Sequence, residues 1–361
     1  METDVLVIGG GPAGLCAAYE AAYAGFKVTV VDESFRMGGQ LKQQTQILNL
    51  PTFMSDQSGQ DLCAALVDRL RMYDVVFLTQ HVMAGLYENG DIGLTDGQTT
   101  QSIAFKKAIM ATGASENPIA FQGWTLPGVM TIGAAQILLN REDALTKGKV
   151  AIVGINKFSV EVIDQFKQKG IDVSVIINGN SSRKEDLQEI KKELVDMDIP
   201  VYIDVTGIQA SGSDEVNQVL IECQGTEMSF DVDIVCVSGG LSPILEPFQV
   251  LGCKLAYQES LGGFVPIYSE TFQTSVPDIY VAGNAAGITS MRSIILTGHI
   301  AGMNAINDLD HTMYNVNRIT TLTNALSKSE SGTKVGEGRE TLFNEYKWQT
   351  TKEQSIKKGV L

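Results

Sequence analysis

The chain has 361 residues, of which 27 are lysine or arginine and 42 are aspartate or glutamate, so its formal net charge at pH 7 is −15. This length can bury the cores of two domains without disulfides or metal ions, and the composition excludes a disordered or collagen-like chain. The acidic balance argues against a protein that binds nucleic acids or anionic membranes, because both ligands require a basic face.

The first predicted elements form a strand–turn–helix–strand unit. An apolar, β-branched run over residues 5–8 leads into the glycines at 9–11, and an alanine-rich helix is predicted over 14–24. A second apolar run over 28–31 then leads to Asp32. This order is typical of a βαβ unit with buried parallel strands.

The turn of this unit satisfies the GxGxxG pattern with Gly9, Gly11 and Gly14. In that pattern the first glycine permits the tight turn, the second lets the backbone approach a pyrophosphate, and the third lets helix and strand pack closely. The helix N-terminus offers unpaired N–H groups to phosphates. Asp32 ends the second strand, where a carboxylate can accept hydrogen bonds from ribose hydroxyls. We therefore predict a dinucleotide site here.

The same layout returns later in the chain. An amphipathic helix is predicted over 58–72, and short strands with turn signals lead to a strand that ends at 108–114. A second βαβ unit follows at an offset of about 145 residues, with apolar runs at 150–153 and 173–175. This duplication predicts two domains of the dinucleotide-binding type.

The second copy has lost parts of the fingerprint. Asn156 replaces the second glycine, Ser159 replaces the third, and Ile177 stands where the first copy has its aspartate. A side chain at 156 obstructs the approach of phosphates, and Ile177 cannot bind a ribose, which argues against ordinary NAD(P) binding. The basic pair Arg183 and Lys184 could meet a 2′-phosphate, but a solvated pair is the favoured interpretation.

The last third of the chain completes the predicted fold. Short strands run to 232–240, a loop-rich stretch reaches 276–287, and a helix is predicted over about 290–309. Residues 311–361 are polar, and we expect a loosely packed tail there. The fold class expected is α/β, with two Rossmann-like, three-layer ββα dinucleotide-binding domains, the second inserted into the first. The expected boundaries are 1–115 with 237–310 for the first domain, 116–236 for the second and 311–361 for the tail.

The five cysteines and three histidines indicate neither a disulfide framework nor a metal site. The cysteines are widely spaced without a CxxC pair, and the histidines lack metal-ligand spacing. The chain begins with an acidic segment that enters a strand rather than with a secretory signal, and it holds no run of about 18 apolar residues. We therefore expect a cytoplasmic protein with no membrane span and no metal.

Four segments together resemble the FAD-dependent oxidoreductases with two dinucleotide domains, the superfamily of thioredoxin reductase and glutathione reductase. They are GGGPAG at 9–14 with Asp32, GGQL at 38–41, ATG at 111–113 and IYVAGN at 279–284. GGQL and the residues after it resemble the flavin-wrapping loop of the thioredoxin-reductase branch. The resemblance implies that the first domain binds FAD rather than NAD.

The resemblance also implies which residues contact FAD. They are Gly9, Gly11, Pro12, Ala13, Gly14, Asp32, Glu33, Gly39, Gln40, Leu41, Thr45, Asn49, Val82, Ala111, Thr112, Gly113, Gly283, Asn284, Arg292 and Ser293. The family usually has aspartate at 284, so Asn284 keeps an acceptor but loses the charge. Arg292 and Ser293 fall at the flavin N1–C2=O edge, where a helix N-terminus and a cation favour reduced, anionic flavin.

The redox cysteines of the superfamily are missing. Thioredoxin reductase carries a CxxC where this chain has Gly-Ala-Ala-Gln at 133–136. The CxxxxC of glutathione reductase is also absent from the first helix, where Cys16 has no partner. With no thiolate to take electrons from a flavin, we expect that the chain is not a disulfide reductase.

The segment over 111–140 resembles the linker in flavin subunits of amine- and amino-acid-oxidising complexes. These include hydrogen cyanide synthase, opine oxidase, heteromeric sarcosine oxidase and dye-linked proline dehydrogenase, and the words ENP, GWTLPGV and GAAQ carry the likeness. Many such subunits end in a cysteine-rich iron–sulfur domain, whereas residues 311–361 contain no cysteine. We therefore expect any cluster on another polypeptide.

The resemblance implies an FAD-dependent oxidoreductase, the flavin subunit of a heteromeric dehydrogenase or oxidase for a small proline-, opine- or glycine-like amine or imino acid. The implied partners, within an oligomer, are a second flavoprotein and a separate iron–sulfur protein. Two alternatives stay open: an NAD(P)H-dependent flavoprotein reductase with ferredoxin, a quinone or a protein as acceptor, and a non-catalytic nucleotide-binding subunit. No catalytic residue can be named from the sequence.

Overall fold

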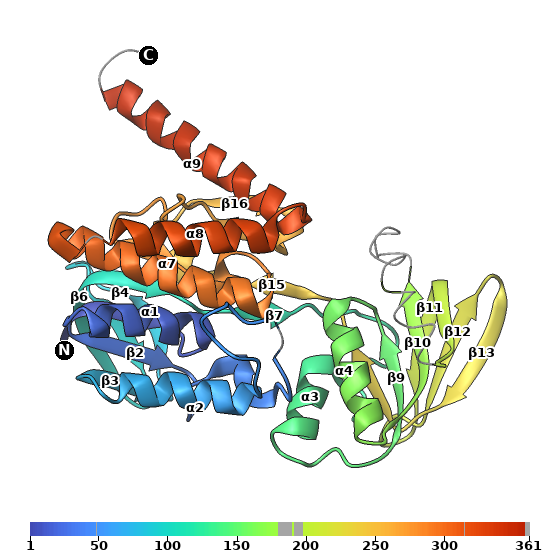
Figure 1. Ribbon diagram of the computed structural model, residues 1–361. Helices are drawn as coiled ribbons and strands as arrows, with labels where there is room; N and C mark the ends of the chain where they lie inside the picture. The colour runs from blue at the N-terminus through green and yellow to red at the C-terminus, as the bar shows by residue number, and fades with distance from the viewer. Residues whose placement is uncertain (48, 180–189, 191–197, 314, 358–361) are drawn as a thin grey trace. The chain divides into compact units, whose positions relative to one another are not determined.

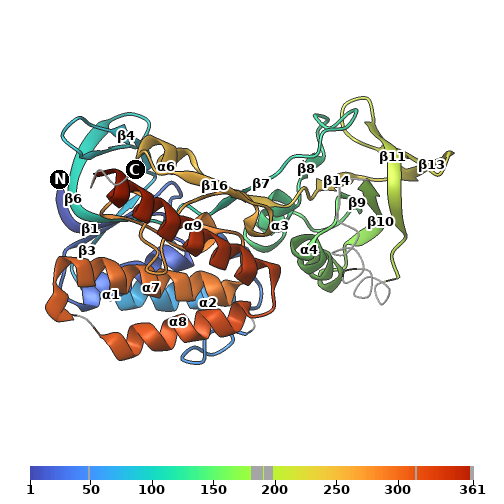
Figure 2. The ribbon, with the colours of Figure 1, turned by 90° about the horizontal axis from the view of Figure 1, so that it is seen from above.

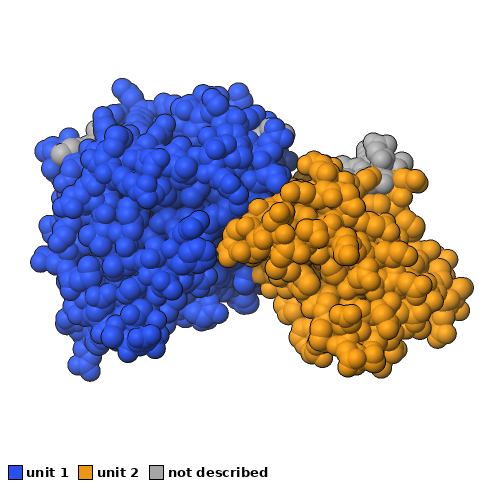
Figure 3. Space-filling view, turned by 90° about the horizontal axis from the view of Figure 1, so that it is seen from below, with its two compact units in different colours: residues 1–115, 242–361 blue, residues 116–241 orange. Residues whose placement is uncertain are grey.

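The computed structural model describes the chain except for residues 48, 180–189, 191–197, 314 and 358–361. The described chain divides into two compact units, which Figure 3 shows in different colours. Unit 1 contains residues 1–115 and 242–361, and unit 2 contains residues 116–241. Each unit is built on its own seven-stranded sheet.

The central strands of unit 1 are parallel. Their order is β3-β2-β1-β6, β18 also pairs with β6, and β5 and β4 extend the sheet through antiparallel pairs. The strands are β1 (Glu2–Ile8), β2 (Val28–Asp32), β3 (Val75–Thr79), β4 (Val82–Leu86), β5 (Ile92–Thr95), β6 (Thr100–Met110) and β18 (Ile279–Val281). Every residue of β2 is buried, as expected of an apolar strand that is covered on both faces.

Helices α1 (Pro12–Tyr23) and α7 (Met291–Leu309) pack against each other, and Figure 1 shows them side by side. A glycine of α7 permits this packing, because a Cβ on Gly298 would lie only 2.3 Å from the carbonyl oxygen of Ala13. This close approach brings α7 onto α1, the helix that follows the glycine turn.

The amphipathic helix predicted over 58–72 is confirmed as α2 (Gly59–Leu70). Its apolar stripe is Leu62, Leu66 and Leu70, and all three leucines are buried. Their spacing of four residues places them on one face of the helix, which is why the sequence pattern was sufficient here.

Residues 311–361 differ from the loosely packed tail that we expected. Their described part forms η4 (His311–Met313), α8 (Val316–Glu330) and α9 (Lys334–Lys357), and Figures 1 and 2 show α8 alongside α7. Leu322 and Leu326 of α8 and Leu342 of α9 are buried in the core of unit 1. The expectation was wrong because the polar composition of this segment hid the spacing of its few leucines.

Unit 2 repeats the layout around a second sheet, in the order β13-β12-β11-β10-β9-β14-β8. The pairs from β11 to β8 are parallel, whereas β11, β12 and β13 form antiparallel pairs. The elements are β8 (Val129–Thr131), α3 (Ile132–Asn140), β9 (Lys149–Val153), α4 (Lys157–Gln168), β10 (Asp172–Gly179), β11 (Val201–Ser211), β12 (Gln218–Cys223), β13 (Thr226–Asp231) and β14 (Ile234–Val237). The predicted α/β class with parallel sheets is confirmed.

The remaining elements are short. Strands β7 (Ala114–Glu116) and β15 (Leu241–Pro243) pair where the chain passes between the units. Unit 1 also contains η1 (Gly39–Gln43), α6 (Glu246–Val250), β16 (Leu255–Gln258), η2 (Glu259–Leu261), β17 (Gly263–Pro266) and η3 (Gly283–Ala286). Among the described helices, none combines the length and the apolar composition that a bilayer crossing requires.

Candidate functional site

The glycine turn between β1 and α1 is shaped by two close approaches and one open position. A Cβ on Gly9, whose φ is +106°, would lie 2.2 Å from the Ala111 carbonyl oxygen, and a Cβ on Gly14 would lie 1.9 Å from the Gly9 carbonyl oxygen. By contrast, nothing lies within 4 Å of the position that a Cβ would take on Gly11. The turn therefore leaves unfilled space beside Gly11, at the N-terminus of α1.

The first turn of α1 has no side-chain cap. Gly11 precedes the helix, Pro12 is its first residue, and no side chain accepts a hydrogen bond at this end. A helix leaves the N–H groups of its first turn without helical partners, and these groups carry a partial positive charge. The backbone near Ala13 and Gly14 is thus suited to an anion such as a pyrophosphate.

Asp32 lies at the end of β2 beside this turn. Its side chain accepts a hydrogen bond from the Gly10 N–H group at 2.7 Å and another from the Ser34 N–H group at 2.8 Å, one on each oxygen. A carboxylate oxygen can accept a second hydrogen bond. Asp32 therefore orders the turn and keeps acceptor capacity for a hydroxyl group.

The start of β4 lies next to the same aspartate. The His81 N–H group donates to the Asp32 carbonyl oxygen at 3.1 Å, which places the following residue, Val82, close to the end of β2. Both Val82 and Glu33 are exposed at this end of the sheet. The three predicted residues at the end of β2 and the start of β4 are therefore neighbours.

The GGQL segment closes against the glycine turn. The Gly38 N–H group donates to the Gly10 carbonyl oxygen at 2.8 Å, and a Cβ on Gly39 would lie 3.0 Å from the Gly11 Cα. Leu41 anchors the segment in the core of unit 1, where it has no exposed surface.

The other predicted residues of this loop are less closely tied to the turn. Gln40, Thr45 and Asn49 are all exposed. The loop itself reaches α7, since the Phe53 ring meets the His299 ring edge-on with 5.6 Å between centroids. Contact of Thr45 and Asn49 with a ligand stays a prediction.

The ATG segment follows β6 and lies beside the end of β1. The Ala111 N–H group donates to the Ile8 carbonyl oxygen at 2.8 Å. The hydroxyl of Thr112 donates to the Ile244 carbonyl oxygen at 3.3 Å. Gly113 has a φ of +80°, and nothing lies within 4 Å of its Cβ position. This segment borders the glycine turn and leaves space there.

The segment after β18 returns to the start of α1. A Cβ on Gly283 would lie 2.8 Å from the Ala13 Cβ, and its N–H group donates to the Thr297 hydroxyl at 2.9 Å. The Asn284 side-chain oxygen accepts a hydrogen bond from the Thr289 N–H group at 3.2 Å. Residues from opposite ends of the sequence thus meet at the carboxyl ends of β1, β6 and β18.

The N-terminus of α7 completes this site. Ser290 caps the helix by accepting a hydrogen bond from the Ser293 N–H group at 3.3 Å, and Ser293 is fully buried. The buried Nε atom of Arg292 has no hydrogen-bond partner within the described chain. A buried donor without a partner costs about 1–3 kcal/mol, so a ligand with an acceptor group fits this position.

These segments fit FAD. The uncapped turn can hold a diphosphate, Asp32 can bind a ribose, and the Arg292 donor is available where a second cofactor end would lie. The structure also adds two glycines that were not predicted to belong to the site. A Cβ on Gly10 would lie 2.2 Å from the Met37 sulfur, and Gly38 has a φ of +115°. The runs of adjacent glycines were the signal for both.

Unit 2 has the corresponding turn, but its own side chains occupy it. Asn156 caps α4 by accepting from the Ser159 N–H group at 3.1 Å, and the Ser159 hydroxyl accepts from the Asn156 N–H group at 2.8 Å. The Asn156 amide also donates to the Ser238 hydroxyl at 2.8 Å. The Asn156 and Ser159 N–H groups, which could otherwise meet a pyrophosphate, thus already have partners within the turn.

The rest of the second fingerprint agrees with this result. Gly154 keeps the left-handed turn with a φ of +92°, and Ile177 is fully buried at the position of the ribose-binding carboxylate. The basic pair Arg183 and Lys184 lies outside the described residues. The second unit thus keeps the glycine that the turn requires but has lost the residues that a dinucleotide would require.

A carboxylate lies beside the Gly-Ala-Ala-Gln segment at 133–136. The Gly133 N–H group, in the first turn of α3, donates to Glu116 at 2.9 Å. A Cβ on Gly133 would lie 2.4 Å from the same carboxylate, so a larger residue here would displace the Glu116 side chain. Glu116 was not predicted from the sequence, although it is the first residue of the word ENP. The five cysteines are all free thiols.

A buried ion-pair cluster lies behind the site, between α1, α7 and α8. His299 Nδ1 lies 2.5 Å from a Glu20 oxygen, to which Arg318 also donates at 2.5 Å. Burial alone would lower the pKa of His299, but the neighbouring Cys16 and Glu20 side chains raise it to about 10. The imidazole is therefore a cation at neutral pH and links these helices.

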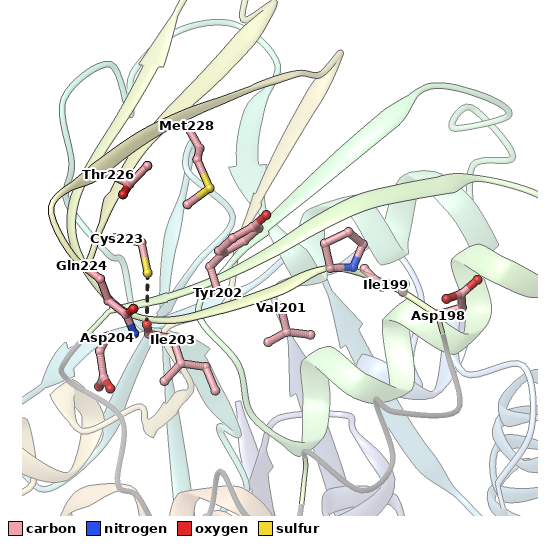
Figure 4. A pocket seen from close by; sticks show the side chains of 11 residues that line it. Asp198, Ile199, Val201, Tyr202, Ile203, Asp204, Cys223, Gln224, Thr226 and Met228 are labelled. Atoms are coloured by element: carbon pink, nitrogen blue, oxygen red, sulfur yellow. Dashed lines mark hydrogen bonds between the residues drawn. The ribbon is translucent and has the colours of Figure 1, made fainter.

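The described part of unit 2 also contains an open hollow of about 1090 Å³. Figure 4 shows its lining side chains, which come from residues 198–200, from the first residues of β11 and from the β12–β13 hairpin. The Cys223 thiol donates to the Ile203 carbonyl oxygen at 3.5 Å. The hollow contains none of the predicted site residues.

Comparison with known families gives one match that spans most of the chain. The family described as pyridine nucleotide-disulphide oxidoreductase matches residues 3–328.

Two individual proteins are similar to this chain in sequence. An opine oxidase subunit of Agrobacterium tumefaciens (strain Ach5) is 31% identical over 332 residues, which are 85% of this chain and 66% of that protein. The alpha subunit of sarcosine oxidase from Corynebacterium sp. (strain U-96) is 26% identical over 317 residues, which are 82% of this chain and 32% of that protein. The chain thus spans less than two thirds of the length of these relatives.

The fold has solved counterparts. L-proline dehydrogenase from P. horikoshii superposes with a TM-score of 0.72 at 21% identity, covering 91% of this chain and 59% of that one. At this identity the likeness concerns the fold alone.

Proposed function

This chain belongs to the pyridine nucleotide-disulphide oxidoreductase family, and on that premise we propose that it is an FAD-dependent oxidoreductase, the flavin subunit of a heteromeric dehydrogenase or oxidase for a small amine or imino acid. The family resemblance predicted from the four sequence segments is confirmed. The family implies FAD binding, and the residues of the site fit that cofactor.

The observation that carries the proposal is the difference between the two glycine turns. The turn before α1 is uncapped and open at Gly11, whereas Asn156 and Ser159 close the turn before α4. This difference supports a dinucleotide site before α1 and argues against one before α4. A flavoprotein that cannot bind a nicotinamide dinucleotide needs another source of electrons, and an oxidisable substrate is such a source.

Each group of residues has a role in this proposal. The turn over 9–14 holds the diphosphate, Asp32 binds the adenosine ribose, and the 283–293 segment meets the flavin end. The α7 N-terminus and Arg292 place positive charge there, which stabilises negative charge on a ligand. When bound, FAD supplies an acceptor for two electrons and a hydrogen from the carbon next to the substrate nitrogen.

The names of the relatives support the substrate class. Opine oxidase and sarcosine oxidase are named for opines and sarcosine. These compounds are amino acids with a secondary amine, so we propose a small proline-, opine- or glycine-like substrate. The electrons would leave to a second flavin, an iron–sulfur cluster or a quinone.

The same names support a role within an assembly, because two of the relatives are called subunits. We propose that the partners are a second flavoprotein and a separate iron–sulfur protein. The free cysteines fit a reducing compartment such as the cytoplasm.

The test is anaerobic reduction of the FAD-loaded chain, followed by absorbance near 450 nm. Proline, sarcosine, glycine and an opine are added separately, and NADH and NADPH serve as competing reductants. We expect one or more amino acids to bleach the flavin and neither nicotinamide to do so. A chain that stays colourless after incubation with FAD contradicts the proposal.

A second candidate is the NAD(P)H-dependent flavoprotein reductase, which the retained α/β fold of unit 2 favours. Fast, saturable bleaching by NADPH without any response to amino acids would support it in place of our proposal. Bound flavin that no reductant bleaches would instead support a non-catalytic subunit.

A further inference from the structure

The segment that connects η3 to α7 is braced from behind by the last two helices of the chain. This segment, residues 283–293, carries Asn284, Arg292 and Ser293 of the candidate flavin site. The polar groups of its middle residues meet side chains from the end of α8 and the start of α9. The brace lies wholly within unit 1.

The centre of the brace is a buried ion pair between Glu330 and Arg339. The guanidinium donates to both carboxylate oxygens, through Nε at 2.7 Å and through Nη2 at 3.0 Å. The residues are 5% and 3% exposed. A two-pronged pair of this kind fixes the relative orientation of its partners, because both hydrogen bonds depend on the same geometry.

The remaining polar capacity of the pair is directed at the 283–293 segment. Glu330 accepts a hydrogen bond from the Thr289 hydroxyl at 3.0 Å, and Arg339 donates to the Ala286 carbonyl oxygen at 3.3 Å. Arg339 also donates to the Tyr268 hydroxyl at 2.6 Å, and that hydroxyl donates to the same Ala286 oxygen at 2.6 Å. The charged pair is thus bound to the segment at two points.

Small residues and aromatic rings hold α9 in place for this contact. A Cβ on Gly336 would lie 2.3 Å from the Glu330 carbonyl oxygen, and a Cβ on Gly338 would lie 2.2 Å from the Ser260 hydroxyl oxygen. The Phe343 ring packs edge-on against the Tyr268 ring with 5.9 Å between centroids. The first turns of α9 therefore lie against the end of α8 and against η2 as closely as the backbone permits.

The contacts continue from the brace to the predicted flavin ligands. Thr289, whose hydroxyl is bound by Glu330, uses its N–H group to bind the Asn284 side-chain oxygen. Ser329, the neighbour of Glu330, lies with its hydroxyl 3.4 Å from the hydroxyl of Ser293. Displacement of the brace would therefore move both the amide of Asn284 and the first turn of α7.

We propose that Glu330 and Arg339 are positioning residues, which hold the 283–293 segment in the conformation that binds the flavin end of FAD. The inference rests on the proposed FAD site. The pair touches no predicted cofactor ligand directly and acts through Thr289 and Ala286. Its charges offset each other, so it fixes the segment while leaving Arg292 as the cation of the site.

The test compares variants of the full-length chain in FAD affinity, flavin midpoint potential and melting temperature. Thr289→Val removes one hydroxyl and keeps the side-chain shape, Thr289→Ser restores the hydroxyl, and Glu330→Gln removes the charge that binds Arg339. Leu342→Ala is the matched control, because it removes a buried apolar side chain of α9 and leaves every hydrogen bond of the brace in place.

We expect Thr289→Val and Glu330→Gln to raise the FAD Kd about 10-fold, the effect of losing one hydrogen bond to a charged group. The midpoint potential should shift in both variants, and Thr289→Ser should restore both values. Leu342→Ala should lower the melting temperature and leave the Kd within about twofold of wild type.

Two results would overturn the inference while leaving the FAD site intact. In the first, the wild type and Thr289→Val bind FAD equally and share one potential. In the second, Leu342→Ala weakens FAD binding as much as the other variants, which would mean that the pair contributes stability alone. A wild-type chain that binds no FAD would overturn both this inference and the proposed function.

Discussion

Gly11 and Gly14 lie three residues apart in the turn after β1, yet a methyl group at each would meet different surroundings. At Gly14 it would collide with the Gly9 carbonyl oxygen, whereas at Gly11 it would enter open space. The φ of Gly11 is −74°, which an alanine also adopts. Gly14 is therefore required by the fold, whereas Gly11 leaves the space in which the proposed ligand would lie.

We predict that Gly11→Ala leaves the melting temperature unchanged and raises the FAD Kd at least about 10-fold, because the added methyl group occupies the phosphate position. Gly14→Ala should lower the melting temperature itself. Gly85→Ala, at an open position of β4, is the control and should change neither quantity. Equal FAD affinity for Gly11→Ala and wild type would refute the assignment of the turn.

At the residue scale, the relative positions of residues could be predicted where these residues are close in sequence. Asp32 could be expected beside the glycine turn because the βαβ pattern fixes both. Glu330 and Arg339 could not, since their partners at Thr289, Ala286 and Tyr268 lie far away in the chain and no local pattern links them. Contacts of that kind depend on tertiary packing.

At the scale of elements, α4 shows how a helix can lose a ligand site and keep its stability. We predict that Asn156→Ala lowers the free energy of unfolding of unit 2 by about 1–2 kcal/mol, because the cap on Ser159 is lost. Asn156→Asp retains an acceptor and should recover most of the loss. Calorimetry measures both, with Ser58→Ala, which removes the cap of α2, as a control that should affect unit 1 only.

The cluster of Glu20, His299 and Arg318 predicts a pH dependence. Because the pKa of His299 is raised from 6.5 to about 10, its contribution to stability is fully present below pH 6.5 and is lost as the pH rises towards 10. Glu20→Gln should therefore lower the free energy of unfolding by about 3–5 kcal/mol near pH 6 and by less at high pH.

Urea unfolding between pH 6 and 10 measures this difference. Asp68→Asn is the control, because Asp68 pairs with Arg71 at the exposed end of α2. Such pairs contribute at most about 1 kcal/mol, so the control should show a small effect at every pH. A Glu20→Gln penalty that does not change with pH would contradict the cationic state of His299.

Helices with regularly spaced apolar residues could be predicted from the sequence, whereas helices with few apolar residues could not. Leu62, Leu66 and Leu70 of α2 recur every four residues, and this period correctly predicted the helix. In α8, Leu322 and Leu326 make a single four-residue step among threonines, asparagines and serines, so composition was misleading there. Burial of a few leucines suffices when neighbouring helices provide the other side of the core.

For the whole molecule, each unit has its own sheet and core, and the open dinucleotide turn lies in unit 1. We predict two calorimetric transitions, of which FAD shifts only one. A ligand at 100 times its Kd stabilises the unit that binds it by about 2.7 kcal/mol. Equal shifts of both transitions would show that the units unfold together.

The open first turn of α1 also has a consequence for biosynthesis. Its amide donors have no partner from a capping side chain, unlike those of α4, so a bound nucleotide would add hydrogen bonds to unit 1. In cells starved of riboflavin, the chain should therefore lack FAD, be less stable and be degraded faster by proteases. Vitamin supply during expression would then set how much intact protein is recovered.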